Sequence, residues 1–422
     1  MDRPARGFSG WWVAGAFAVM VFLSTGVRFA VGPFLKPMVA DLGLDRASYS
    51  LVVALSLLLY GVFMPLLGGL AERLGARVVT VGGILVFALS VSATGLVRHL
   101  WQFALVYGVF VALGLAATGH VLGSAVVSRW FTRRRATALS LLGAASMAGM
   151  SLLVPVAMGL ILAVGWRAAY AVLGLGALVI LLPIGLWVVR ESPEAMGLLP
   201  DGLPVHAGTG TSASVERTDV REAVRALPFW QLSGALFTCG FSMSLLSAHG
   251  VPMLTDHGYP PMLASGALGV LGASSFGFAM LLGAIADRFG RRPVLAWLYG
   301  TRALLFAAMF LVHQGPTALL AIAALGGASM AGTLAMTSAL TADIFGRFSV
   351  GSVFGTVFLL HQAGAALGSW PGGLVFDLTG SYALAFALAS VQLLVAAVVS
   401  LTVDERPRSL PTLRPVTTET WA

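Results

Sequence analysis

A single arginine lies inside a stretch of sequence that is otherwise almost free of polar residues. Arg28 stands between Phe22 and Phe34, where only Ser24 and Thr25 are also polar. An arginine in hydrocarbon costs about 3 kcal/mol or more on insertion scales, so its side chain must face a cavity, an anion or a partner. The guanidinium stays charged, and its planar fork can bind a carboxylate through two parallel hydrogen bonds. This pattern predicts a site for a small organic anion at Arg28, with snorkelling toward the headgroups as the alternative.

Further polar side chains within apolar runs could complete this site or move a proton. The candidate substrate-binding residues are Arg28, Ser24, Thr25, Tyr60, His120 and His361. The candidate proton-coupling residues are His120, His249, His361, Asp256 and Asp377. Histidine titrates near neutral pH and can relay a proton. Each of these residues could instead serve only an interhelical hydrogen bond, and the sequence leaves both interpretations open.

Arg302 is a second arginine within an apolar run, and it could contact either a substrate or a polar group of its own half of the chain. The single cysteine, Cys239, also lies in an apolar run and cannot form an internal disulfide. The sequence contains no metal-ligand cluster, nucleophile–base pair or phosphate-binding loop. It therefore predicts neither an enzyme nor a bound metal or cofactor.

The composition indicates which solvent surrounds these residues. Of the 422 residues, 58% are hydrophobic and only 10% are charged, whereas soluble domains carry about 25% charged residues. Apolar runs long enough to cross a bilayer recur between short polar segments, and they do not alternate as barrel strands do. The sequence therefore predicts an all-α integral membrane protein. The twelve expected spans are 11–35, 49–70, 78–97, 102–127, 136–163, 168–189, 229–253, 262–284, 294–313, 317–340, 351–374 and 382–402.

The polar segments divide the chain and orient it. They predict an N-terminal six-helix bundle over 1–190, a cytoplasmic linker over 191–227, a C-terminal six-helix bundle over 228–405 and a cytoplasmic tail over 406–422. With the N-terminus inside, 19 arginines fall on the inner side and 4 basic residues on the outer side, as the positive-inside rule requires. We therefore expect a multi-pass membrane protein with both termini in the cytoplasm. The net charge of +8 then needs no nucleic-acid partner.

Two short motifs occur twice at the same spacing. Pro37 to Gly43 recurs as Pro252 to Gly258, and Glu72 to Gly75 recurs as Asp287 to Gly290, each 215 residues later. Because the linker falls between the copies, we expect two related bundles. Parallel repeats of this kind are a transporter architecture, in which the substrate site lies between the halves near the membrane midplane.

The repeated loop resembles a known family signature. The segment from Gly68 to Arg77 is similar to the loop motif of the major facilitator superfamily, and the segment from Gly283 to Arg292 is a fuller match. The resemblance implies twelve transmembrane helices in two pseudo-symmetric six-helix bundles. It also implies that charged loop residues latch the halves at the inner surface, with a structural or topogenic role as the alternative. The candidate gating residues are Glu72, Arg73, Arg77, Asp287, Arg288 and Arg292.

Other segments resemble monocarboxylate transporters and oxalate/formate-type antiporters, particularly bacterial members. Trp130 to Arg135, followed by Ala138, is similar to their fifth-helix signature, and Ser9 to Trp12 partly resembles their first-helix signature. Monocarboxylate transporters carry a first-helix lysine at about the depth of Arg28. These carriers commonly place an arginine in helix eight, at the position where this chain has Ala279.

The resemblance implies a monomeric secondary transporter of the bacterial inner membrane. Its expected activity is symport of a small organic anion, above all a monocarboxylate, with protons by alternating access. Exchange of organic anions and export of drugs are the alternatives within transport. A nutrient sensor that binds without translocation is an alternative of another class, and the sequence contains no signalling domain that would favour it.

Overall fold

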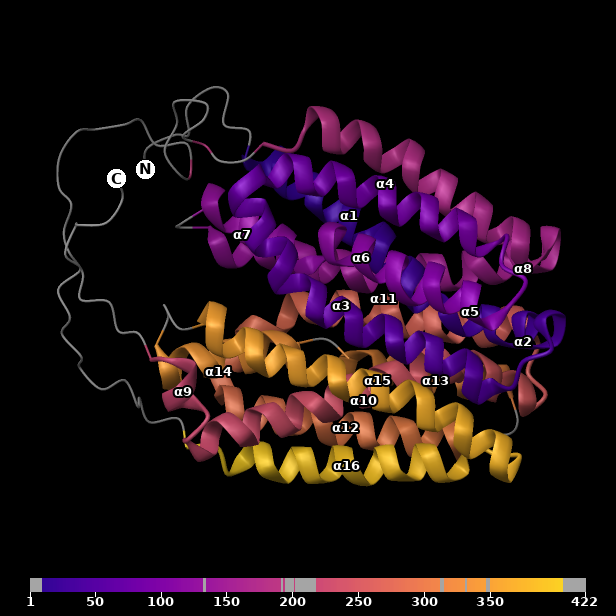
Figure 1. Cartoon of the computed structure of the whole chain (residues 1–422). Helices are drawn as coiled ribbons and strands as arrows, with labels where there is room; N and C mark the ends of the chain where they lie inside the picture. Colours follow the sequence, from indigo (N-terminus) through magenta and orange to yellow (C-terminus); the bar gives the residue numbers. More distant parts are fainter. Residues whose placement is uncertain are drawn as a thin grey trace, which may run out of the picture.

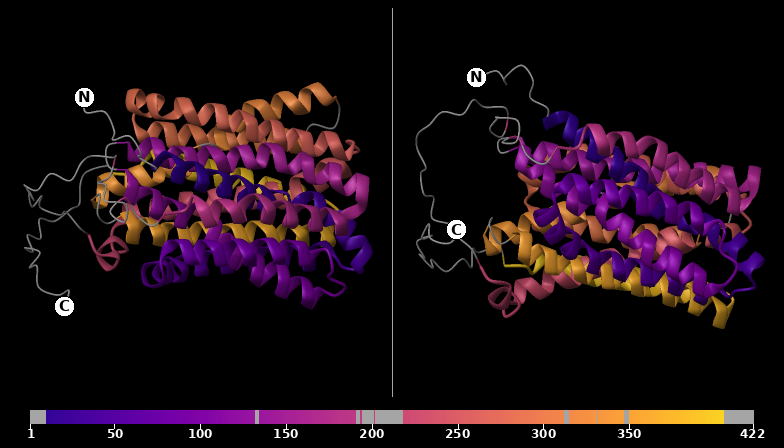
Figure 2. Two further views of the ribbon diagram at one scale, coloured as in Figure 1. Left: turned by 90° about the horizontal axis from the view of Figure 1, so that it is seen from above. Right: turned by 45° about the horizontal axis from the view of Figure 1, so that its top comes forward.

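A computed structural model describes residues 10–131, 134–190, 193, 201, 218–311, 315–330, 332–346 and 350–404. The regular secondary structure of these residues is helical throughout. The helices run roughly along one common axis (Figure 1), and the two further views in Figure 2 show the same alignment. Helices suit a lipid solvent because they satisfy the backbone hydrogen bonds within each segment.

Nine helical elements are described in the N-terminal half. These are α1 (Gly10–Phe29), α2 (Val31–Leu42), α3 (Arg46–Leu74), α4 (Ala76–Thr94), α5 (Leu100–Phe103), the π-helix η1 (Ala104–Val111), α6 (Ala112–Thr118), α7 (His120–Trp130) and α8 (Arg135–Trp187). The elements described in the C-terminal half are α9 (Val220–Ala223), α10 (Leu227–Asp256), α11 (Pro261–Phe289), α12 (Arg291–Leu311), α13 (Pro316–Met330), α14 (Thr333–Phe345), the π-helix η5 (Val350–Phe354), α15 (Gly355–Thr379) and α16 (Ala383–Leu401).

The described helices account for the predicted twelve membrane crossings. Ten helical stretches are long and apolar enough to cross a bilayer. One of them contains α8, which Gly165 divides into two helical segments with a φ of 81° and a ψ of 163°. Each segment exceeds the roughly 20 residues that one crossing needs, and the 25 residues of α15 provide a further crossing. The predicted all-α membrane fold is confirmed.

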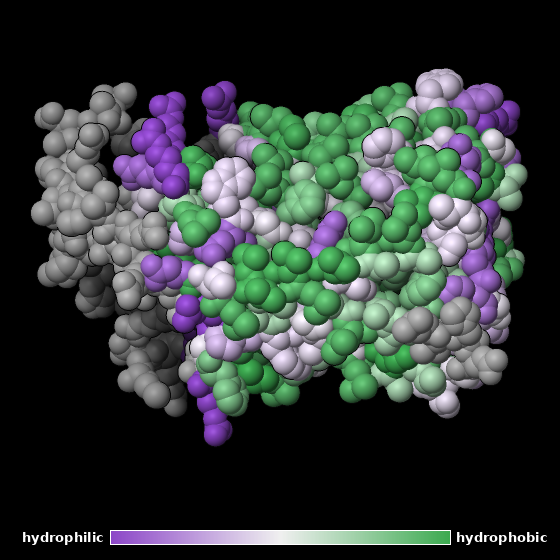
Figure 3. Space-filling model, turned by 90° about the horizontal axis from the view of Figure 1, so that it is seen from below, coloured by the Kyte–Doolittle hydropathy of each residue, from purple (hydrophilic) through white to green (hydrophobic). Residues whose placement is uncertain are grey.

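The bundle has two polar ends and an apolar middle. We call the end with α9 and the first turns of α1 and α10 the linker end, and the opposite end, with the α2–α3 turn and the last turn of α10, the distal end. Figure 3 shows hydrophobic surface across the middle of the molecule and hydrophilic residues gathered mainly at the two ends. This distribution matches a protein whose middle lies in hydrocarbon.

The internal repeat is visible in the backbone. Gly43 and Gly258, 215 residues apart, both have positive φ, of 63° and 88°. Gly75 and Gly290 have the same spacing, with φ of 90° and 85° and ψ of 141° and 156°. In each half this second glycine separates two long helices, α3 from α4 and α11 from α12. Only glycine adopts such backbone angles readily, so the repeated motif fixes the same turn in both halves.

Glycine also allows α10 and α15 to pack closely. A Cβ on Gly364 of α15 would overlap the carbonyl oxygen of Phe237, and a Cβ on Gly368 would overlap that of Phe241. Both carbonyls belong to the backbone of α10, which cannot swing aside as a side chain could. The small-residue pair therefore sets the distance between these two helices.

We expect Gly364→Ala to lower the thermal stability of the purified protein, although alanine favours a helix more than glycine does. The added methyl group must push α15 away from α10, and such overpacking costs about 1–3 kcal/mol. Thermal unfolding in detergent, followed by tryptophan fluorescence, measures the effect. Gly266→Ala in α11 is the matched control, since a Cβ there meets nothing within 4 Å. Equal melting temperatures for the two variants would contradict the packing argument.

Candidate functional site

Arg28 lies near the middle of the first membrane crossing. α1 and α2 are separated only by Ala30, so the crossing extends over 10–42. The predicted span of 11–35 ended too early because Pro37 interrupts the apolar run, yet the helix continues through it. About 20 Å of helix lie between Arg28 and the distal end of α2. The guanidinium is therefore deeper in the bundle than its position in the predicted span indicated.

The Arg28 guanidinium has no anionic partner among the described residues. Its Cζ atom lies 5.3 Å from the centroid of the Tyr60 ring on α3, within the range of a cation–π interaction. Tyr107 of η1 also lies close enough for an electrostatic interaction. The side chain is partly exposed, and none of the four ion pairs between described residues includes it. Its charge is thus available to an anion.

The fourth membrane crossing breaks next to this arginine. α6 ends at Thr118 and α7 begins at His120, because Gly119 between them is extended, with a φ of −86° and a ψ of −173°. A Cβ on Gly119 would lie 3.0 Å from the hydroxyl oxygen of Tyr60. The hydroxyl of Ser24 on α1 lies 3.5 Å from the Thr118 carbonyl oxygen. α1, α3 and the break therefore converge, and the first N–H groups of α7, which lack intrahelical partners, lie at this convergence.

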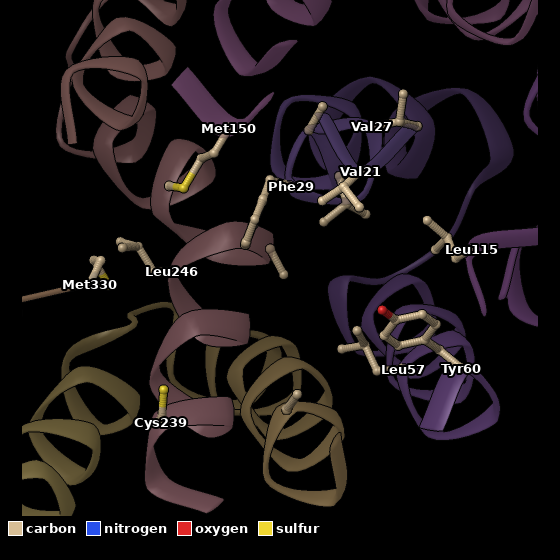
Figure 4. Packing of buried hydrophobic residues seen from close by; sticks show 14 of the residues in the cluster. Val21, Val27, Phe29, Leu57, Tyr60, Leu115, Met150, Cys239, Leu246 and Met330 are labelled. Atoms are coloured by element: carbon tan, nitrogen blue, oxygen red, sulfur yellow. The ribbon is translucent and has the colours of Figure 1, made fainter. Parts of the chain in front are cut away.

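The predicted residues of the N-terminal half thus lie together. Ser24 and Arg28 share α1, with half-buried Thr25 between them, and Tyr60 faces them from α3. Figure 4 shows the Tyr60 hydroxyl directed toward α1, with Leu115 alongside. His120 is partly exposed, and its Nδ1 atom lies 3.1 Å from the hydroxyl of Ser124 on the same helix.

His361 lies in the other half, at the interface between the two. It is buried on α15, stacks on Phe358, and has its Nδ1 atom 2.8 Å from the amide oxygen of Gln362. The Gln362 amide in turn donates to the carbonyl oxygen of Leu57 on α3, at 3.4 Å. His361 is therefore connected to the helix that carries Tyr60, but its described contacts do not include Arg28.

An ion-pair network joins the two halves at the distal end. Asp256, at the end of α10, accepts hydrogen bonds from both terminal nitrogens of Arg46 on α3, at 2.6 and 3.2 Å. The Lys36 ammonium group of α2 lies 2.7 Å from the same carboxylate. The Arg46 guanidinium also stacks on Phe376 of α15, with its Cζ atom 3.6 Å from the ring centroid. Two cations of the N-terminal half thus share one carboxylate of the C-terminal half.

A second carboxylate caps a helix of the opposite half. Asp377 of α15 accepts hydrogen bonds from the backbone N–H groups of Arg46 and Ala47, at 3.3 and 2.6 Å. These N–H groups belong to the start of α3 and have no partner within their own helix. Asp45 caps the same helix from its own half by accepting a hydrogen bond from the Ser48 N–H. Hydrogen bonding with the side chain of Ser48, and then with its N–H, lowers the pKa of the Asp45 carboxyl.

His249 belongs to the same network. It is fully buried, and its Nε2 atom lies 2.8 Å from the carbonyl oxygen of Ser369 and 3.4 Å from the hydroxyl of Ser50 on α3. Because Nε2 donates to that carbonyl, Nδ1 of the neutral ring accepts a hydrogen bond from the Tyr382 hydroxyl at 3.2 Å. The Tyr382 oxygen in turn accepts a hydrogen bond from Arg46 at 2.8 Å.

We call this network the distal lock. It comprises Lys36, Arg46, His249, Asp256, Asp377 and Tyr382.

The candidate gating arginines at the linker end bind within their own halves. Arg77 donates to the carbonyl oxygen of Leu186 at the end of α8, and Arg292 donates to that of Val403 after α16, at 2.7 Å. Cations suit these positions because the last carbonyls of a helix lack partners. The other candidates are exposed (Arg73, Arg288) or have side chains outside the described residues (Glu72, Asp287). Their gating role stays a prediction.

Sequence reasoning missed several residues that the structure brings together. Arg46 and Tyr382 of the distal lock are 336 residues apart, and Arg46 and Asp256 are 210 apart. Tyr107, which lies near Arg28, is part of an apolar run without any other polar signal. Asp256 lies within the repeated motif from Pro252 to Gly258. Asp256, Asp377 and His249 were also candidates for proton coupling, so these three residues of the distal lock had a sequence signal.

The chain is similar to one family over most of its length. The sequence model described as Major Facilitator Superfamily matches residues 17–313 and 274–421. The MFS-type transporter YcxA of Bacillus subtilis is 26% identical over 387 residues, which cover 87% of this chain and 88% of the relative. Monocarboxylate transporter 11 of Homo sapiens is 27% identical over 431 residues, covering 98% of this chain and 86% of the relative. Monocarboxylate transporter 13 of Bos taurus is 24% identical over 405 residues, covering 95% and 90%.

The fold has a counterpart among solved structures. A bacterial homologue of the human lysosomal transporter Spinster, in an inward-facing and unoccupied conformation, superposes with a TM-score of 0.65. The match covers 94% of this chain and 96% of that one at 17% sequence identity. At this identity the likeness establishes the shared fold.

We expect Asp256→Asn to open the distal end. The substitution leaves Lys36 and Arg46 facing each other without their shared carboxylate, so the closed arrangement loses its main attraction. Pulsed electron resonance between spin labels on the exposed residues Ala40 and Leu378, one in each half, measures the distance across this end. The population with the longer distance should rise about tenfold.

Arg167→Gln is the matched control, because it removes an ion pair at the same end within one half. Arg167 binds Asp41 at 2.8 Å, and both residues belong to the N-terminal half. This variant should leave the distance distribution unchanged. A distribution that is equal in Asp256→Asn and the unmodified protein would show that the lock does not hold the halves together.

Proposed function

The chain belongs to the Major Facilitator Superfamily and is a transporter, and from this premise we propose that it takes up a small monocarboxylate together with a proton. The observation that carries the proposal is the Arg28 guanidinium, which lies deep in the bundle without an anionic partner among the described residues. Such a charge is costly unless an anion meets it. The similarity to monocarboxylate transporters 11 and 13 favours the same class of substrate.

The surroundings of Arg28 suit one carboxylate group. The guanidinium can hold both carboxylate oxygens through parallel hydrogen bonds. The positive end of α7, which starts at His120 beside the break, adds a second attraction for negative charge. The Tyr60 ring stabilises the guanidinium but offers no competing negative charge. One arginine and one helix end together balance a single anion rather than two.

The membrane potential explains why a proton would accompany the substrate. Moving one uncompensated charge across 100 mV costs about 2.3 kcal/mol, so an anion entering against an inside-negative potential needs a compensating cation. His120, beside the site, and His361, at the interface between the halves, are the residues we propose to carry this proton. Asp256, Asp377 and His249 are bound within the distal lock, and we assign them to closing that end.

Transport requires that the site open to one side at a time. We propose that the bundles over 1–190 and 228–405 rock about Arg28, with the linker over 191–227 joining them. The positive-inside distribution favours a linker end in the cytoplasm and a distal end outside. The distal lock then closes the outer side, and its opening admits substrate from outside. We propose the bacterial inner membrane as the location and a monomer as the working unit.

We expect Arg28→Gln to reduce monocarboxylate uptake into proteoliposomes about 10- to 100-fold, since a hydrogen-bonded charge contributes about 1.5–3 kcal/mol. Arg28→Lys should retain part of the activity because it keeps the charge but loses the fork. The measurement is uptake from a panel of labelled monocarboxylates, and Arg98→Gln at an exposed position is the control. Normal uptake by Arg28→Gln would refute the site. Transport of neutral drugs or dicarboxylates alone would refute the substrate class.

We expect His120→Gln or His361→Gln to remove the stimulation of uptake by a pH gradient while leaving counterflow between preloaded and external substrate. Counterflow needs only the loaded carrier to reorient, whereas net uptake needs the proton to bind and leave. His99→Gln, at an exposed loop position, is the control and should respond to the gradient normally. A full response to the gradient in the double variant of His120 and His361 would mean that another group carries the proton. No response to the gradient in the unmodified protein would favour exchange as the activity.

A further inference from the structure

Arg302 is an arginine fully buried inside the C-terminal half. It lies near the middle of α12 with 0% of its surface exposed. One terminal nitrogen lies 3.2 Å from the sulfur of Cys239 and 3.5 Å from the hydroxyl of Ser242, both on α10. The other donates to the carbonyl oxygen of Ser329 on α13, at 2.6 Å. Among the described residues, no Asp or Glu forms an ion pair with it.

This charge cannot be removed by losing a proton, because arginine stays protonated in proteins. A buried charge without a counter-charge is strongly destabilising. The groups around Arg302 must therefore supply an anion. Tyr299 on α12 and Cys239 on α10 are the described neighbours that can lose a proton to become negative. A free thiol does so at about pH 8.5 and a free phenol at about pH 10, so the thiol is the stronger acid.

We propose that Cys239 is a thiolate and the counter-ion of Arg302. Two donors contact its sulfur, as an anion requires. They are Arg302 and the hydroxyl of Thr333 on α14, which lies 3.2 Å from the sulfur, while the His361 ring of α15 is close enough to interact electrostatically. Only 1% of Cys239 is exposed, so water does not compete for these bonds. The thiol proton leaves to solvent when the pair forms, and the charge is balanced within the half.

The thiolate of this pair can also take up a proton again. Protonation of the thiolate gives a neutral thiol beside Arg302, and the His361 ring is the neighbour that can deliver the proton. The titratable groups that face the sulfur are Arg302 and Tyr299 from α12 and His361 from α15, while α13 and α14 contribute only hydroxyl and carbonyl groups among their described residues. His361 contacts Gln362, which reaches α3.

Cys239 is therefore connected to the interface between the halves, although Figure 4 shows it on the side of the view opposite Tyr60. The ion pair itself is independent of what the protein transports. Only its use as a proton site rests on the proposed function.

The single cysteine of the chain makes the pair directly measurable. The difference in ultraviolet absorption between the detergent-purified protein and Cys239→Ser reports the thiolate band of this one sulfur. We expect the band at neutral pH, where an ordinary thiol is protonated, and we expect it to persist below about pH 7. Arg302→Gln should abolish it, and Arg302→Lys should keep it. Absence of the band in the unmodified protein, or its survival in Arg302→Gln, would overturn the proposal.

If Arg302→Gln does not fold, infrared spectroscopy of the unmodified protein tests the same ion pair independently. A thiolate has no S–H stretching band, and a protonated Cys239 must show one that Cys239→Ser lacks. Proton-driven uptake by Cys239→Ser tests the proton site separately. If Cys239→Ser still takes up substrate in response to the pH gradient while the unmodified protein shows the thiolate band, the proton site is refuted but the ion pair stands.

Discussion

Positive charge in a low-dielectric interior needs a partner, and three arginines in this bundle meet that need in three ways. Arg46, at the distal end, shares the Asp256 carboxylate with Lys36 across the two halves. Arg302 binds a sulfur and a carbonyl oxygen within its own half. Arg28 has neither arrangement, and its described interactions are with aromatic rings. We therefore assign Arg46 to a contact between the halves, Arg302 to a contact within one half, and Arg28 to the proposed substrate site.

The same helices carry the site and the lock, so the two are mechanically related. α3 contributes Arg46 at its first residue and Tyr60 fourteen positions later, near its middle. α15 contributes Asp377 near its end and His361 closer to its start. A tilt of α3 relative to α15 that separates Arg46 from Asp377 must also move Tyr60 relative to His361. Occupancy of the site and closure of the distal end can therefore influence each other without any additional moving part.

Local sequence patterns predicted the helices and the repeat, because both depend on properties of neighbouring residues. The apolar runs and the motifs ending at Gly75 and Gly290 were sufficient for the fold, and the turn angles of those glycines agree. Arg28, Ser24 and Tyr60, which were chosen as polar residues in apolar runs, lie close together, and their role in substrate binding stays a prediction. The break at Gly119 and the partnership of Asp377 with Arg46 were not predictable, because each depends on residues brought together only by packing. The length of the first crossing was misjudged because a proline inside a helix looks like an end.

The cap that Asp377 places on α3 makes the order of one helix depend on the docking of two halves. The N–H groups of Arg46 and Ala47 are satisfied by a carboxylate from across the interface. When the halves part at that end, water must replace this carboxylate, and the first turn of α3 becomes free to fray. The amide protons of these two residues should then exchange with solvent at a rate set by how often the bundle opens. The hydrogen-exchange rate of a single helical turn thus reports the movement of the two halves relative to each other.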